Sequence, residues 1–172
     1  MNQFIVQGIG FIAFLLVVVS FQLNNRKQIL TLLFLVTVLF TIHFALLGAW
    51  VGSAMNLIAA IRNFFFIHNE KKWARSKLWL YVFITLFWIA GILTFKSPLS
   101  ILPIIAMTID SFVVWSSKTK TIRFGILIPR PLWFIYNYSV SSYPGMFVEV
   151  FVTLSILIGI FRFDIPKKVK VS

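Results

Sequence analysis

The chain contains no cysteine, and only four of its 172 residues are acidic. Without cysteine it can form no disulfide, no thiolate metal site and no cysteine nucleophile. It also lacks the Gly-x-Ser-x-Gly elbow of hydrolases, a His-x-x-x-His metal pair and a glycine-rich phosphate loop. We therefore expect a protein that is not an enzyme, has no catalytic residues and uses no metal or cofactor.

Charge of either sign is scarce, because only 12% of the residues are charged while 60% are hydrophobic. Phenylalanine alone accounts for 20 residues. This composition lies well outside the range of soluble domains and is typical of a protein embedded in lipid.

Seven apolar runs follow one another with short interruptions. A helix needs about 20 mostly apolar residues to cross a bilayer, and in lipid each segment must satisfy its own backbone groups. The runs cover 4–23, 29–48, 50–67, 78–95, 99–115, 122–138 and 146–161. The pattern predicts an all-α membrane protein with seven transmembrane helices, the first of them retained rather than cleaved as a signal peptide.

The basic residues predict the orientation, because cytoplasmic loops are enriched in Lys and Arg. With the N-terminus outside and the C-terminus in the cytoplasm, thirteen basic residues fall on the cytoplasmic side and only Lys96 on the other. We expect these cations to contact anionic lipid headgroups, above all in the C-terminal tail, and we expect no nucleic acid partner. Whether the chain forms a homodimer stays open.

A shift of 93 residues lays the first three predicted helices over the last three without a gap. Landmarks coincide: Lys27 falls on Lys120, Gly52 on Gly145, and Asn56 on Glu149, although only seven of 65 aligned positions are identical. The expected domains are a first repeat (4–68), a basic loop and linker helix (69–96), a second repeat (97–163) and a basic tail (164–172). Because the linker crosses once, the two repeats should be parallel, in a 3+1+3 arrangement.

This organisation resembles the triple-helix units of the SWEET, SemiSWEET and PQ-loop transporter superfamily across residues 4–68 and 98–162. In detail, the run from Gln7 to Gln22, the pair His43-Phe44 with Gly48, and Asn56 with Ile61-Arg62 are similar to the YgjV-type bacterial inner membrane proteins. The resemblance implies a multi-pass protein of the bacterial inner membrane.

In the PQ-loop family a Pro-Gln pair stands near the cytoplasmic end of the first helix of each unit. This chain has Phe21-Gln22 and Val114-Trp115 there, so the proline is missing twice. In SWEET-type transporters an aromatic residue of the second helix and an asparagine of the third line the pocket. The resemblance thus implies Phe40 and Trp133 as the aromatic pair and Asn56 and Glu149 as the polar pair.

Ionisable groups within lipid are costly and mark functional sites by default. Glu149 indicates a cationic substrate, a proton-coupled step or an arginine partner. Arg130 lies between Pro129 and Pro131, which remove two backbone donors near the centre of the sixth helix and free carbonyls that could face a substrate. An Arg130–Glu149 pair could open and close with the pocket, or it could be a permanent structural contact.

Asp110 could carry a proton if it has no partner, or it could pair with Arg123 or Lys118 near the membrane interface. Gly10 and Pro103, which coincide across the repeat, join Pro129 and Pro131 as expected hinge residues. Arg62, within the third apolar run, is a further candidate of this kind, or it could extend its charge toward the headgroups.

Trp133, Tyr136 and Asn137 fall on one face of the sixth helix and could contact a polar solute, although an interfacial aromatic belt is the alternative. His43 coincides with Tyr136 across the repeat and is expected to be packed and hydrogen-bonded rather than a metal ligand.

Two functions follow. The first is a transporter of a small polar solute, with a pocket lined by Phe40, Asn56, Trp133, Tyr136, Asn137 and Glu149. The second is a non-transporting membrane protein that assists a complex or handles lipid, for which a tightly packed core without a cavity is expected.

Overall fold

A computed structural model describes residues 3–21, 23, 25–68, 70–116 and 119–163. All regular structure in these ranges is helical. The helices are α1 (Gln3–Phe21), α2 (Arg26–Leu46), α3 (Trp50–Ile67), α4 (Leu78–Leu93), the 3-10 helix η1 (Pro98–Ser100), α5 (Ile101–Trp115), α6 (Thr119–Leu127), α7 (Arg130–Ser139) and α8 (Tyr143–Phe163). The predicted basic tail, residues 164–172, and Lys118 lie outside the described residues.

Most helices begin and end close to the predicted runs, and α3 has the predicted bounds. The start of α2 is fixed by Asn25, whose side chain accepts hydrogen bonds from the backbone N–H groups of Lys27 and Gln28. The last helix starts at Tyr143 rather than Met146, because Pro144 lies in its first turn, where a missing N–H costs no intrahelical hydrogen bond.

The sixth predicted run is two helices, α6 and α7, that meet at Ile128 and Pro129. Pro129 and Pro131 have no N–H to donate, so the hydrogen-bond ladder cannot run through this point. The expected break at the Pro-Arg-Pro sequence is therefore confirmed, and Arg130 becomes the first residue of α7.

Four described helical segments are long and apolar enough to cross a membrane: Gln3–Ser20, Lys27–Leu46, Trp50–Ile67 and Pro98–Trp115. Shorter apolar helices cover Leu78–Leu93 and Tyr143–Ile158, while α6 and α7 are each shortened by the break. Large apolar side chains such as Ile92, Leu93 and Ile158 lie on the outside. An apolar exterior of this extent fits a lipid environment rather than water.

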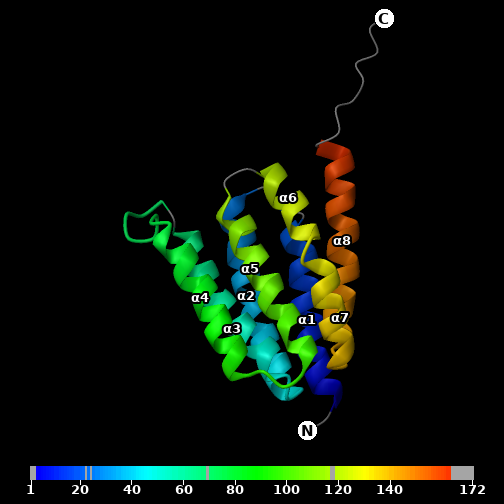
Figure 1. Cartoon of the computed structure of the whole chain (residues 1–172). Coiled ribbons are helices and arrows are strands. Elements are labelled where there is room, and N and C mark those ends of the chain that lie inside the picture. The colour runs from blue at the N-terminus through cyan, green and yellow to red at the C-terminus, as the bar shows by residue number, and fades with distance from the viewer. Residues whose placement is uncertain (1–2, 22, 24, 69, 117–118, 164–172) are drawn as a thin grey trace, which may run out of the picture.

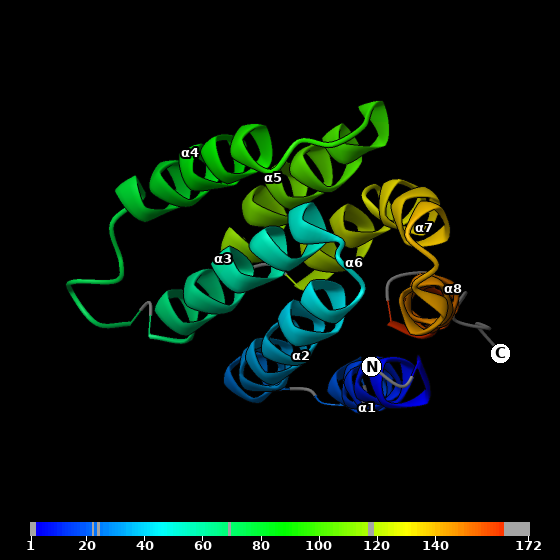
Figure 2. The ribbon, with the colours of Figure 1, turned by 90° about the horizontal axis from the view of Figure 1, so that it is seen from below.

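The helices form a ring with one helix outside it (Figures 1 and 2). Contacts run from α1 to α2, α3, α5, α7, α8 and back to α1, and α4 packs against α3 and α5 from outside. Figure 1 shows the N-terminus at the end where the turns at 47–49 and 140–142 lie, which we call the N-terminal face. The described loop residues 70–77, before α4, and the end of α8 lie at the opposite face.

Helix ends and turns recur at the offset of 93 residues. Arg26 and Thr119 begin equivalent helices, as do Trp50 and Tyr143. The turns at the N-terminal face each contain one residue with positive φ, Gly48 at 69° and Ser141 at 54°. Four backbone N–H to carbonyl hydrogen bonds of the first turn each have a counterpart 93 residues later. In the first turn they run from Leu47 to His43, Gly48 to Ala45, Ala49 to Phe44 and Ser53 to Ala49. In the second they run from Val140 to Tyr136, Ser141 to Tyr138, Ser142 to Asn137 and Met146 to Ser142.

Candidate functional site

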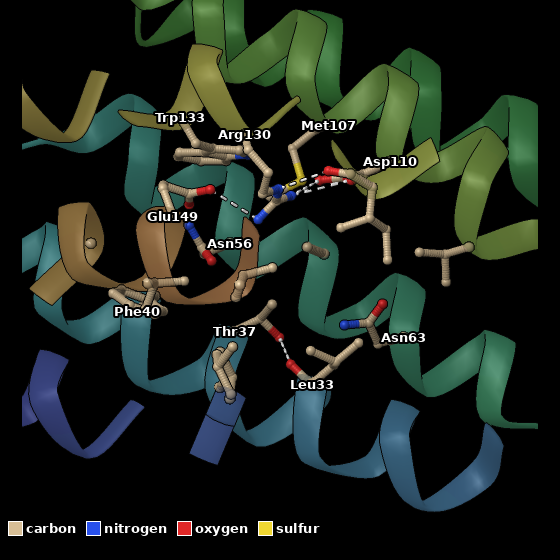
Figure 3. A pocket seen from close by; sticks show the side chains of 18 of the residues that line it. Leu33, Thr37, Phe40, Asn56, Asn63, Met107, Asp110, Arg130, Trp133 and Glu149 are labelled. Carbon is tan, nitrogen blue, oxygen red and sulfur yellow. Dashed lines mark hydrogen bonds and ion pairs between the residues drawn. The ribbon is translucent and has the colours of Figure 1, made fainter. Parts of the chain in front are cut away.

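A cavity of about 130 Å³ lies inside the ring of helices. Every helix of the ring contributes to its wall, and α4 does not. Figure 3 shows Asn56, Asp110, Arg130, Trp133 and Glu149 around it. The cavity therefore lies where the helices before and after α4 meet.

The wall of the cavity contains pairs of residues at the offset of the predicted repeat. Seven pairs of lining residues are separated by 93 positions: Val17 and Asp110, Leu33 and Ile126, Thr37 and Arg130, Phe40 and Trp133, Phe44 and Asn137, Asn56 and Glu149, Ala59 and Val152. We call α1 to α3 the first copy and α5 to α8 the second copy of the predicted repeat. Positions 93 residues apart in the two copies thus face one space. The three charged members of these pairs all belong to the second copy, and their first-copy equivalents are neutral.

Arg130 lies between two carboxylates contributed by α5 and α8. Its Nη2 is 3.2 Å from Asp110 Oδ2 and 3.4 Å from Oδ1. Its Nη1 is 3.1 Å from Glu149 Oε2. The sequence predicted the contact between Arg130 and Glu149, which the structure contains, and its role in gating stays a prediction.

The helix break places the Arg130 side chain. Its Nε donates a hydrogen bond of 2.9 Å to the carbonyl of Ile126, one turn earlier. A carbonyl in the last turn of α6 is thus occupied by the arginine itself. The carbonyls that lose an α-helical donor to proline are those of Gly125 and Leu127. In the first copy Thr37 donates to the carbonyl of Leu33 at the same relative position, also at 2.9 Å.

Asp110 is not an unpaired carboxyl, which corrects the premise of a lone proton carrier. Its partner is Arg130 from another helix, because α5 packs against α7. The expected alternatives, Lys118 and the side chain of Arg123, lie outside what the structure describes.

Arg62 does not extend to the headgroups, one of the two placements expected for it. It is buried, its Nη1 donates to Ser111 Oγ at 2.8 Å, and its guanidinium lies 5.6 Å from the centre of the Phe87 ring. The packing of α3 against α5 and α4 supplies these partners, so the charge is held inside the protein. Arg62 also lines the cavity, a position that only its isolation in an apolar run could have signalled.

Phe40, Trp133, Asn56, Asn137 and Glu149 all line the cavity. An aromatic row connects the first two, because the ring of Phe44 is 5.7 Å from Phe40 and 6.2 Å from Trp133 between centroids. Sequence reasoning did not assign Phe44 to the pocket, although it follows Phe40 by one helical turn.

Tyr136 is not among the residues that line this cavity, and its role as a binding residue stays a prediction. Its hydroxyl oxygen accepts a hydrogen bond of 2.9 Å from the backbone N–H of Gly52, at the start of α3. Only glycine fits there, because a Cβ would lie 2.9 Å from the Tyr136 ring and 3.0 Å from Phe44. The hydroxyl therefore connects α7 of the second copy to α3 of the first.

His43 makes the reciprocal connection, and its expected burial and hydrogen bonding are confirmed. Its Nδ1 lies 2.8 Å from the carbonyl of Val6 and must donate to it, so Nε2 of the neutral ring accepts from Ser142 Oγ at 2.9 Å. His43 thus reaches Ser142 in the turn at 140–142, and Tyr136 reaches Gly52 in the first turn of α3. We call these two contacts the crossed contacts, and both lie near the N-terminal face.

The expected hinge residues have different surroundings. Gly10 is packed tightly, since a Cβ there would lie 2.6 Å from Pro144 Cγ and 3.0 Å from His43 Cε1. Pro103 lies in the first turn of α5, directly after η1, and α5 continues through it. Among the proposed hinges, helix interruption is therefore found at Pro129 and Pro131 and not at Pro103.

Replacing Tyr136 with Phe is expected to destabilise the protein by about 1–3 kcal/mol, because the buried N–H of Gly52 loses its acceptor. The melting temperature of the purified protein should then fall by about 2–4 °C for each kcal/mol. Tyr138→Phe is the matched control, since Tyr138 is 73% exposed. Equal melting temperatures for the two variants would contradict the importance of this contact.

Comparison with known proteins gives one family. Residues 4–167 match the model of the Imp-YgjV family, described as a bacterial inner membrane protein. The chain is 26% identical over 157 residues to the inner membrane protein YgjV of Escherichia coli (strain K12), covering 91% of this chain and 83% of that protein. No solved structure matches the chain.

Proposed function

The chain belongs to the Imp-YgjV family of bacterial inner membrane proteins, and from this premise we propose that it moves a small polar solute across that membrane. The proposed movement is by alternating access between two three-helix repeats, the mechanism that the predicted resemblance to SWEET and PQ-loop proteins implies. The observation that carries the proposal is the cavity lined by equivalent residues of both copies. A site at the interface of two repeats is the usual place for a transporter substrate.

In the proposed architecture, α1 to α3 form the first repeat and α5 to α8 the second, with α6 and α7 together making one crossing. The linker helix α4 makes the repeats parallel and gives seven crossings. Support comes from the helix ends and turns that recur at 93 residues. The N-terminal face is placed outside the cell.

The orientation is supported by the loop between α3 and α4 at the opposite face. Its four basic side chains are exposed: Lys71, Lys72, Arg75 and Lys77. We propose that they contact anionic headgroups of the cytoplasmic leaflet, since each Lys or Arg near such a surface contributes about 1 kcal/mol of attraction.

The alternative of a non-transporting membrane protein is less well supported. It predicts a tightly packed core between the two copies, whereas a cavity with four ionisable residues in its wall lies there. Groups of this kind are costly to keep in a membrane protein and are expected where a polar solute must be accommodated.

The proposal is tested by solute entry into proteoliposomes. Vesicles are mixed with hyperosmotic solutions of small sugars, amino acids or polyamines, and their reswelling is followed by stopped-flow light scattering. At least one solute should enter faster than into protein-free vesicles. Glu149→Gln and Asn56→Ala should slow that entry about tenfold or more, because a polar contact to a charged or buried group is lost.

Glu70→Gln is the control variant, because Glu70 is exposed in the loop after α3 and far from the cavity wall. It should leave entry unchanged. Solute entry that is insensitive to both cavity variants, or that no tested solute shows, would contradict the proposed function.

A further inference from the structure

Three polar atoms of the cavity wall have no hydrogen-bond partner among the described residues: Arg62 Nε, Asn137 Oδ1 and Glu149 Oε2. All three side chains are more than nine-tenths buried. Buried polar atoms are nearly always hydrogen-bonded, so three exceptions around one cavity require an explanation. A ligand in the cavity that supplies the missing partners is such an explanation.

The three atoms differ in what they require. Asn137 Oδ1 and Glu149 Oε2 are acceptors and need N–H or O–H donors. Glu149 Oε2 lies 3.1 Å from Arg130 Nη1, so this oxygen already has an ion-pair partner, and a carboxylate oxygen can accept a further donor beside it. Arg62 Nε is a cationic donor and needs an acceptor. The ligand must therefore offer donors on one side and an acceptor on the other.

The charges of the wall restrict the ligand further. Arg62 and Arg130 are cationic, Asp110 and Glu149 are anionic, and their formal charges cancel. A ligand with a net charge would leave one charge uncompensated in a low-dielectric interior, which is costly. A ligand with one positive and one negative group keeps the balance and pairs with both kinds of site.

Arg130 is the least available of the four groups, because it already contacts the carbonyl of Ile126, Asp110 and Glu149. Arg62 belongs to the first copy, whereas Asn137 and Glu149 belong to the second. A ligand that pairs with both sides therefore connects the two copies across the cavity. The available volume of about 130 Å³ is similar to the roughly 150 Å³ of an engineered cavity that binds benzene, a molecule of about six heavy atoms.

We propose that the cavity binds a small zwitterion, an amino acid of about the size of alanine, with its ammonium group at Glu149 and Asn137 and its carboxylate at Arg62. This rests on the proposed function, since it names the class of solute that the cavity accepts. The aromatic row of Phe40, Phe44 and Trp133 supplies the apolar part of the wall.

The test compares four compounds on the purified wild-type protein. Alanine carries both charges, ethylamine lacks the carboxylate, propionate lacks the ammonium group, and glycerol has hydroxyls without charge. At concentrations far above its Kd, alanine should raise the melting temperature by about 5 °C, because it binds only the folded state. Ethylamine, propionate and glycerol should have no comparable effect. An equal shift with any of these three, or no shift with alanine, would overturn the proposal.

Variants locate the binding. Glu149→Gln and Arg62→Lys should each remove the alanine-dependent shift, while Glu70→Gln should retain it. If both cavity variants fold and retain the shift, the assignment of the two ends is wrong.

The two proposals fail in different ways. Alanine that stabilises the protein but does not enter proteoliposomes contradicts transport and leaves binding intact. If glycerol or a sugar enters the proteoliposomes and alanine does not stabilise the protein, transport is supported and the proposal that the cavity binds a zwitterion is overturned.

Discussion

A Gly10→Cys/Pro144→Cys variant is expected to lose solute entry when oxidised and to regain it when reduced. A Cβ built at Gly10 lies 2.9 Å from Pro144 Cβ, and a disulfide needs about 3.5–4.5 Å, so a small adjustment suffices. The bond would tie α1 of the first copy to α8 of the second beside the crossed contacts. Alternating access requires this face to open, so the tie should abolish it.

The measurement is solute entry into proteoliposomes before and after treatment with a reductant. The natural chain has no cysteine, so the two introduced thiols are the only ones that can react. The single variants Gly10→Cys and Pro144→Cys are the controls and should respond to neither oxidation nor reduction. Equal entry in the oxidised and reduced double variant would argue for a pathway that does not involve opening of the N-terminal face.

Replacing Arg130 with Met should destabilise the protein by about 3–5 kcal/mol, because Asp110 and Glu149 would remain buried without their cation. A loss of this size corresponds to a fall in melting temperature of about 10 °C. Thermal unfolding of the purified variant in detergent measures it.

The triple variant Asp110→Asn/Arg130→Met/Glu149→Gln separates lost charge balance from lost packing. Removing all three charges together should restore most of the stability, since a neutral set leaves no uncompensated charge. The first copy already holds neutral residues, Val17, Thr37 and Asn56, at the equivalent positions. A triple variant that melts as low as Arg130→Met would show that the arginine stabilises through packing and through its bond to Ile126.

Much of the helical framework could be read from the sequence, because each apolar run is interrupted by residues with a definite local effect. Asn25 caps α2, Gly48 takes the positive φ of a turn, and Pro129 with Pro131 divides the sixth run. These effects act over a few residues and need no knowledge of neighbours. The alignment of Gly52 with Gly145 predicted equivalent positions, which lie in the first turns of α3 and α8 rather than in the preceding turns. The contact between Glu149 and Arg130 was predicted because a charge in lipid requires a partner.

The tertiary structure alone decided which side of each helix faces the interior. In a helix that is apolar all round, the hydrophobic pattern does not distinguish the face toward lipid from the face toward other helices. For that reason the sequence could not show that Arg130 pairs with Asp110 as well as with Glu149. Nor could it show that Arg62 donates to Ser111 or that Tyr136 accepts from Gly52. Local chemistry determined where helices begin, break and end, whereas the rotation of packed helices about their own axes determined which residues meet.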